Sequence, residues 1–286
     1  MKTSKDNKTG PVIVGGVGGS GTRVVTQILQ ELDFFIGNDL GNALDNRIFS
    51  LLFKRVNWRK KSDYKEIKTY LEIFERYMFG EKLSCSHNRQ VLKILFDPKI
   101  KRKPYQIFGL IRFFLKKKGK VKKRWGWKEP NTHIYLESFL RYFKDMKYVH
   151  LVRHGLDMAF SENNKQLYTW GPYFGIDVPK EKNKLPLSQL DYWIVTNNKV
   201  RDVCKKNKDR CLLLNYDDLC SHPKKTLKKL LKFLEIEVDK PKLERLSKLP
   251  RLPSSIGRYK RHGDFFTEEQ KKEVESFGFL VEYDSF

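Results

Sequence analysis

The chain has 286 residues, 40% of them hydrophobic, which is enough for one large domain with a buried core. Its 58 lysines and arginines outnumber 34 acidic residues, and the formal net charge of +24 favours anionic ligands. The sequence has no apolar run of about 18 residues that would suggest a membrane span, and residues 1–10 are polar and charged, without an apolar signal region. The four cysteines lack the spacing of a zinc site or a disulfide framework. We therefore expect a soluble cytoplasmic protein with a flexible tail at residues 1–10 and a single domain at residues 11–286.

Hydrophobic periodicity predicts strands that alternate with helices along the chain. Strands are expected at 12–16, 34–37, 147–152 and 211–215. Helices are expected at 20–32, 62–79, 88–96, 105–118, 131–143, 155–166, 187–206 and 224–234. A turn is expected at 125–130, a loop over the site at 168–187, and an irregular C-terminal end. The alternation indicates an α/β fold of three layers, with a central parallel sheet flanked by helices.

A glycine-rich turn separates the first predicted strand from the first predicted helix. It carries five glycines between positions 15 and 21, so its backbone amides can converge on an anion at the N-terminus of the helix. Ser20 and Thr22 add hydroxyl donors. The turn therefore predicts a P-loop-like site for a ligand that carries phosphate.

Three later segments add groups that suit a nucleotide. Arg153 is expected at the end of a strand, with Ser161 eight residues on, where both can hold one phosphate. Tyr216 is expected at the end of the next strand. The alternative to a binding role is a tyrosine that only caps the strand end in a half-buried position. Residues 257–261 form a basic turn with Arg258 and Lys260. An exposed turn without a binding role explains it equally well, because basic residues are mostly found at the surface.

Together with the glycine turn, these segments resemble the sulfotransferases that use 3′-phosphoadenosine 5′-phosphosulfate (PAPS), over residues 12–261. The resemblance implies that PAPS is the donor and that one site grips both of its anionic ends. Residues 18–23 would hold the 5′ end through Gly18, Gly19, Ser20, Gly21, Thr22 and Arg23. Arg153 and Ser161 would hold the 3′-phosphate, Tyr216 would lie near the adenine, and Arg258 and Lys260 would close on the 3′-phosphate.

The chain departs from the family pattern at Gly19, where relatives carry a lysine or arginine that touches the bridging oxygen. Lys128 lies in a Lys-Glu-Pro turn similar to the Lys-Asp-Pro turn of tyrosylprotein sulfotransferases, and it is expected to supply this charge, with Arg23 in reserve. Stacking of Lys128 on the neighbouring tryptophans is the alternative. Because Gly19 replaces the family's cation, a second interpretation is that the protein binds the donor without catalysing transfer.

A general base must accept the proton of the acceptor. Asp39 is the first candidate, because related enzymes place an acid at the end of the second strand, although an ordinary turn at 37–39 explains it equally well. Glu129 and His154 are the rivals. No metal is expected, because the transferring sulfonate carries less charge than a phosphoryl group.

The acceptor is expected to be a hydroxyl or amine of a small molecule or glycan. A carbohydrate is preferred, because aromatic and basic residues can stack on and neutralise an acidic glycan. A nucleotide kinase or phosphotransferase is an alternative, although Gly21 is followed by Thr22 and Arg23 instead of the expected lysine. A dinucleotide fold fits the glycine spacing at 16–21, with Asp33 or Asp39 as the acid. A nucleic-acid-binding protein is less favoured, although residues 99–124 carry twelve basic and no acidic residues.

Overall fold

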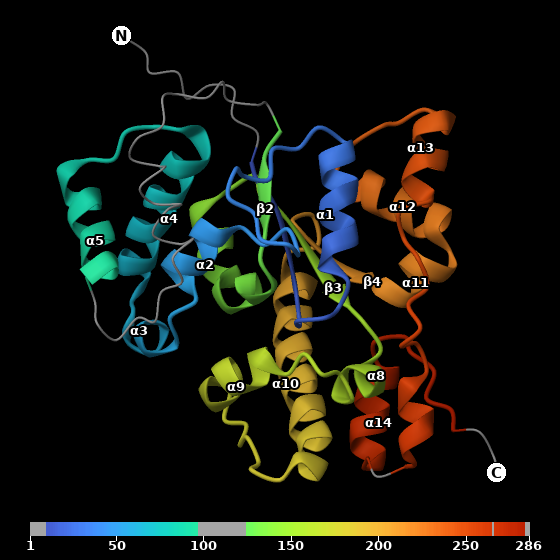
Figure 1. Ribbon diagram of the computed structural model, residues 1–286. Helices are drawn as coiled ribbons and strands as arrows, with labels where there is room; N and C mark the ends of the chain where they lie inside the picture. The colour runs from blue at the N-terminus through green and yellow to red at the C-terminus, as the bar shows by residue number, and fades with distance from the viewer. Residues whose placement is uncertain (1–9, 97–123, 265, 284–286) are drawn as a thin grey trace.

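A computed structural model describes residues 10–96, 124–264 and 266–283 (Figure 1). Its sheet is four-stranded, in the order β2-β1-β3-β4, and every pair of neighbouring strands is parallel. Because the strands are parallel, their carboxyl ends meet at one edge of the sheet, which is where ligands bind in open α/β folds. The strands are β1 (Val12–Gly16), β2 (Gly126–Lys128), β3 (Lys147–Val152) and β4 (Cys211–Asn215).

Helices cover both faces of the sheet (Figure 1). One apolar cluster joins α1 (Thr22–Glu31), α12 (Pro223–Phe233) and α13 (Lys240–Ser247) to Val14, Leu151 and Leu214 of the strands. The other cluster joins α2 (Arg47–Phe53), α4 (Tyr64–Phe79), α7 (Leu136–Tyr142) and α10 (Leu185–Lys206) to Ile13, Trp127 and Tyr148. Alternate residues of one strand therefore enter opposite clusters, which confirms the predicted three-layer α/β fold.

Shorter segments complete the described chain. The α-helices are α3 (Val56–Lys61), α5 (Cys85–Phe96), α8 (Gly155–Ala159), α9 (Lys165–Trp170), α11 (Tyr216–Ser221) and α14 (Glu268–Glu275). The 3₁₀ helices are η1 (Pro130–Tyr135), η2 (Gly171–Tyr173), η3 (Lys182–Lys184) and η4 (Arg258–His262).

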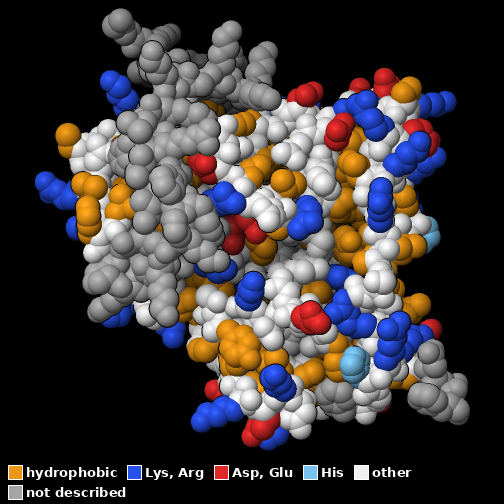
Figure 2. All heavy atoms as spheres, in the orientation of Figure 1, with side chains coloured by type: hydrophobic (Ala, Val, Ile, Leu, Met, Phe, Trp, Pro, Cys, Tyr) orange, Lys and Arg blue, Asp and Glu red, His pale blue; other side chains and the backbone are white. Residues whose placement is uncertain are grey.

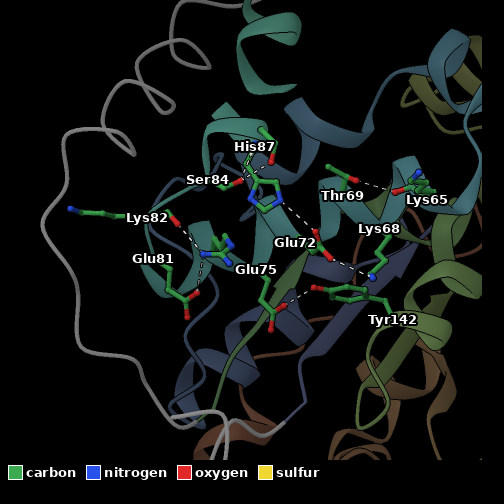
Figure 3. A network of polar contacts seen from close by, with 12 residues as sticks. Lys65, Lys68, Thr69, Glu72, Glu75, Glu81, Lys82, Ser84, His87 and Tyr142 are labelled. Atoms are coloured by element: carbon green, nitrogen blue, oxygen red, sulfur yellow. Dashed lines mark hydrogen bonds and ion pairs between the residues drawn. The ribbon is translucent and has the colours of Figure 1, made fainter. Parts of the chain in front are cut away.

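Polar contacts tie α4 to α5 and α7 (Figure 3). The Nε2 atom of His87 lies 3.4 Å from Glu72, and the Tyr142 hydroxyl donates to Glu75 at 2.8 Å. Glu72, Glu75 and Tyr142 also line a cavity of about 480 Å³ whose wall includes Pro11 and Asp145, which precede β1 and β3. This network therefore lies at the amino edge of the sheet, opposite the loops that follow the strands.

The three longest predicted strands are confirmed, whereas the prediction for 34–37 is wrong. Phe35 makes only an isolated bridge to Trp125, and the fourth strand is β2, inside the expected turn at 125–130. A β-carbon at Gly126 would lie 2.0 Å from the carbonyl oxygen of Val12. This glycine therefore lets a three-residue strand approach β1 closely, and so short a segment has no readable periodicity.

The predicted helices at 20–32, 62–79, 88–96, 187–206 and 224–234 correspond to α1, α4, α5, α10 and α12. Residues 131–143 begin as η1. The helix expected at 155–166 ends early, at Ala159 of α8, and α9 begins only at Lys165. Arg258 donates to the Phe160 carbonyl at 3.1 Å, just past the end of α8. The expected loop at 168–187 contains η2 and η3, and the expected irregular end contains α13 and α14.

Two predictions fall partly or wholly outside the described residues, namely the tail at 1–10 and the helix at 105–118. The single domain at 11–286 stays a prediction. None of the helices in the described ranges combines the length and apolar character needed to cross a lipid bilayer.

Candidate active site

The glycine turn between β1 and α1 bends sharply at the carboxyl edge of the sheet. Gly19 and Gly21 have φ angles of +100° and +87°, in the region that favours glycine. A β-carbon at Gly21 would lie 2.1 Å from the Tyr216 ring. The start of α1 therefore packs directly on the residue that follows β4, and position 21 accepts no side chain.

Replacing Gly21 by alanine should destabilise the fold through both the backbone angle and this contact. We expect a loss of about 3 kcal/mol or more in the free energy of unfolding, measured by urea denaturation. Gly175 is the matched control, because its φ is +75° and nothing lies within 4 Å of a β-carbon built there. Gly175→Ala should cost about 1–2 kcal/mol. Equal losses in the two variants would show that the Tyr216 contact contributes nothing.

Arg153 joins the turn to two other parts of the chain. It follows β3, is only 8% exposed, and donates from Nη1 to the Gly19 carbonyl at 3.3 Å and from Nη2 to Ser255 Oγ at 2.5 Å. Its guanidinium carbon lies 5.5 Å from the centre of the Tyr216 ring. Its buried Nε has no hydrogen-bond partner among the described residues, which is costly for a cation unless an anion binds there.

The segment after β3 also lies against the turn. The Ser161 hydroxyl lies 3.7 Å from the place of a Gly19 β-carbon, and it accepts a hydrogen bond from the Asn163 amide at 3.2 Å. Asp157, 1% exposed, accepts bonds from the amides of Gly257, at 2.9 Å, and Tyr259, at 3.3 Å. The buried carboxylate of Asp157 therefore holds the basic turn beside α8.

The basic turn brings a second arginine close to Arg153. Burial lowers the pKa of Arg258, and the positive charge of Arg153 lowers that pKa further. Lys260 lies in the same 3₁₀ helix, η4. Two cations placed near each other suit a multiply charged anion, because the anion relieves their repulsion. Figure 2 shows lysine and arginine side chains across the region between α1, α8 and α9, with fewer acidic ones among them.

Lys128 ends β2 and is 2% exposed. Its ammonium group donates to the Ala43 carbonyl at 2.9 Å and pairs with Asp45 at 2.5 Å. Asp39 belongs to the same loop as Asp45, is half-buried, and accepts a hydrogen bond from the Tyr77 hydroxyl at 2.7 Å. The loop between α1 and α2 therefore supplies both the ion-pair partner of Lys128 and the predicted base. Arg23 is exposed in the first turn of α1.

The two rival bases are engaged in other contacts. Both carboxylate oxygens of Glu129 accept hydrogen bonds from Asn131, at 2.7 and 2.8 Å, and burial raises the pKa of this 3% exposed carboxyl. His154 donates from Nε2 to the Leu280 carbonyl at 2.9 Å, and its ring stacks on Tyr259 with centroids 4.8 Å apart. Asp39, which is half-buried, is the most exposed of the three groups.

Several site residues were not predicted from the sequence, namely Asp45, Asn131, Asp157, Gln166 and Ser255. Asp157 lies between Arg153 and Ser161, about one helical turn from each, and this spacing is a signal in the sequence that could have predicted it. Asn131 lies in η1 and Gln166 in α9, Asp45 and Ser255 lie in loops, and no local sequence pattern marks any of the four.

A profile of the sulfotransferase family matches residues 11–240, which is most of the chain. The chain belongs to the sulfotransferase family. The predicted family and enzyme class are thereby confirmed, and the match spans the glycine turn, Lys128, Arg153 and Tyr216. The resemblance of the Lys-Glu-Pro turn to tyrosylprotein sulfotransferases stays a prediction.

Solved sulfotransferase structures share this fold. The sulfotransferase domain of the Synechococcus PCC 7002 olefin synthase has a TM-score of 0.50 and 17% identity, covering 99% of each chain. The sulfotransferase domain of the curacin biosynthetic pathway has a TM-score of 0.50 and 14% identity, covering 96% of this chain and 99% of that one. Sulfotransferase STF9 from Mycobacterium avium has a TM-score of 0.50 and 12% identity, covering 97% of this chain and 79% of that one. No curated protein matches the sequence significantly.

Proposed function

We propose that this sulfotransferase moves a sulfuryl group from PAPS to a hydroxyl or amine of an acceptor molecule. The observation that carries the proposal is the contact of Arg153 with Gly19, because it joins the glycine turn and the end of β3 into one site. A nucleotide with anionic groups at its 5′ and 3′ positions needs both parts at once. The family membership supplies the reaction type.

Donor binding follows from the groups at the carboxyl edge of the sheet. The turn at 18–23 would hold the 5′-phosphosulfate at the positive end of α1, through the amides of Gly19, Gly21 and Thr22. The Gly18 amide donates instead to Gln166, and the amide and hydroxyl of Ser20 donate to the Val17 carbonyl. Arg153, whose Nε has no hydrogen-bond partner in the described part of the chain, would hold the 3′-phosphate together with Ser161, and Arg258 and Lys260 would close on the same group. Tyr216 would lie beside the adenine.

In the transfer step, the acceptor oxygen or nitrogen forms a bond to sulfur while the bond from sulfur to the bridging oxygen breaks. Negative charge grows on the leaving phosphate oxygen, so a cation placed there lowers the barrier. Lys128 is the proposed cation, with Arg23 in reserve. Because Asp45 pairs with Lys128, the ammonium must share or leave that carboxylate when the donor binds.

The acceptor proton passes to Asp39 in the proposed mechanism. The Tyr77 hydroxyl holds this carboxylate in place at 2.7 Å. An acceptor of carbohydrate type, with acidic groups, remains our preference, since basic side chains surround the edge where it would enter (Figure 2).

Calorimetry with 3′-phosphoadenosine 5′-phosphate (PAP), ATP and NAD tests the proposed donor. PAP should bind more tightly than ATP or NAD, and the affinity should be the same with magnesium or EDTA. Tighter binding of ATP that requires magnesium would instead support a phosphotransferase. Affinity for DNA that falls steeply with salt, with no preference for PAP, would support a nucleic-acid-binding protein.

Replacing Asp39 by asparagine should lower kcat by a factor of about 10² to 10⁴, because the acceptor proton loses its base. PAP affinity should stay within about twofold, since the asparagine keeps the shape of the side chain. Steady-state kinetics with a soluble acceptor gives both values, and Asp33→Asn, an exposed aspartate after α1, is the control. A normal kcat in Asp39→Asn together with a large loss in Glu129→Gln would assign the base to Glu129.

A further inference from the structure

A relay of buried hydrogen bonds runs from the Lys-Glu-Pro turn to the glycine turn. Asn131 donates from both its backbone amide and its side chain to the Glu129 carboxylate. Gln166 donates from Nε2 to Asn131 Oδ1 at 2.8 Å, and the Gly18 amide donates to Gln166 Oε1 at 2.7 Å. The three side chains are 3%, 3% and 6% exposed, so water does not compete for these bonds.

The direction of the relay is set by its Gly18 end, because a backbone amide can only donate. Gln166 therefore turns its Oε1 to Gly18 and its Nε2 to Asn131, and the side-chain amide of Asn131 donates to Glu129. Turning the amide group of Asn131 or Gln166 around would place donor against donor and acceptor against acceptor. Both amide groups therefore have one favourable orientation, and the relay holds a single geometry.

The relay connects two parts of the chain that the proposed function places at the phosphosulfate end of the donor. Glu129 directly follows Lys128, the proposed cation, and Gly18 opens the turn that would hold the 5′ end. Gln166 lies in α9, five residues after Ser161. The same segment of the chain therefore also carries a residue proposed to bind the 3′-phosphate. The glycine turn and this segment lie close together at Gly18, where a β-carbon would lie 3.2 Å from Asn163 Nδ2.

We propose that Gln166 is a positioning residue that directs the Gly18 amide inward and, through Asn131 and Glu129, keeps the glycine turn in register with Lys128. This inference rests on the proposed function for its effect on turnover. Gly18 donates to Gln166, and the amide and hydroxyl of Ser20 donate to the Val17 carbonyl, so the 5′ end is left to the amides of Gly19, Gly21 and Thr22. Loss of the relay would let the turn shift against Lys128, and a misplacement of about 1 Å can cost a factor of about 10² in rate.

The test compares Gln166→Met with Gln189→Met. Methionine keeps the length of the side chain without its hydrogen bonds, and Gln189 is an equally buried glutamine of α10 whose Oε1 has no partner among the described residues. Gln166→Met should lower kcat about thirtyfold and PAP affinity less than about threefold. Gln189→Met should leave both unchanged. Equal kinetic losses in the two variants, or a normal kcat in Gln166→Met, would overturn the proposal.

A double-mutant cycle separates a relay from independent contacts. Asn131→Ala should lower kcat by a similar factor, and the double variant Asn131→Ala/Gln166→Met should be no worse than either single variant. Gln166→Glu offers an acceptor to Gly18 but cannot donate to Asn131, so it should lose as much as Gln166→Met. Losses that multiply in the double variant, or a normal kcat in Gln166→Glu, would contradict the relay.

Amide hydrogen exchange tests the relay without any nucleotide. The Gly18 amide should be protected in the wild-type protein and should exchange faster in Gln166→Met, while the amides of α1 keep their protection. An unprotected Gly18 amide in the wild type would refute the relay. If the wild type fails to bind PAP while Gly18 is protected, the proposed donor is wrong and the relay stands.

Discussion

Arg153→Ala should weaken PAP binding about a hundredfold, equivalent to about 2.7 kcal/mol, because it removes a buried, charge-assisted contact to the 3′-phosphate. The native side chain already donates to Gly19 and Ser255, and its Nε has no partner among the described residues. The structure therefore holds the guanidinium in place before the donor arrives. Isothermal titration calorimetry measures the affinity directly.

The decisive comparison uses a ligand that lacks the 3′-phosphate. Adenosine 5′-phosphate should lose less than about threefold in affinity when Arg153 is replaced, since the contact is absent in both proteins. Arg210→Ala is the control variant, because Arg210 donates to the Leu140 carbonyl at 3.0 Å, near the start of β4 and away from the glycine turn. Equal losses for the two ligands would dismiss the assignment of Arg153 to the 3′-phosphate.

Lys128→Ala should lower kcat by a factor of about 10² to 10³ with less than about threefold change in PAP affinity. The ammonium would stabilise charge that appears only as the bond to sulfur breaks, so its removal affects the transition state and not the bound ground state. Single-turnover assays with PAPS separate this step from product release.

Asp45→Asn distinguishes the charge of Lys128 from its structural contact. In the native protein the ammonium also donates to the Ala43 carbonyl, which Asp45→Asn leaves intact. We expect this variant to fold and to keep most of its turnover, because the cation remains. If Lys128→Ala retains full turnover while Arg23→Ala loses it, the role of the cation passes to Arg23.

The strands illustrate what local sequence can predict. β1, β3 and β4 are apolar runs with Ile13, Val149 and Leu214 fully buried, so burial on both faces is visible in the composition of each run. β2 has three residues and depends on Gly126 lying against Val12, a contact between segments more than a hundred positions apart. No window along the chain contains that contact.

The missed C-terminal helices show a different limit. α13 begins after Asp239, whose side chain accepts from the Lys242 amide, and α14 begins with a capping box of Thr267 and Gln270. Both starts are readable in the sequence, because capping depends on residues within one turn. The expectation of an irregular end was therefore wrong, although the capping residues Asp239 and Thr267 mark the starts of both helices.

For the site, the residues themselves indicated the chemistry. The five glycines before α1 and the arginine at the end of β3 predicted an anion-binding edge, because backbone freedom, charge and spacing are local properties. The family was predicted from the resemblance of these segments, and of the segment with Tyr216, to sulfotransferase motifs. Only the tertiary structure decided which groups meet: Gly21 against Tyr216, Arg153 with Ser255, Lys128 with Asp45, and Gly18 with Gln166. Such pairings depend on how distant segments pack around the sheet, and burial then makes each bond specific because water is excluded.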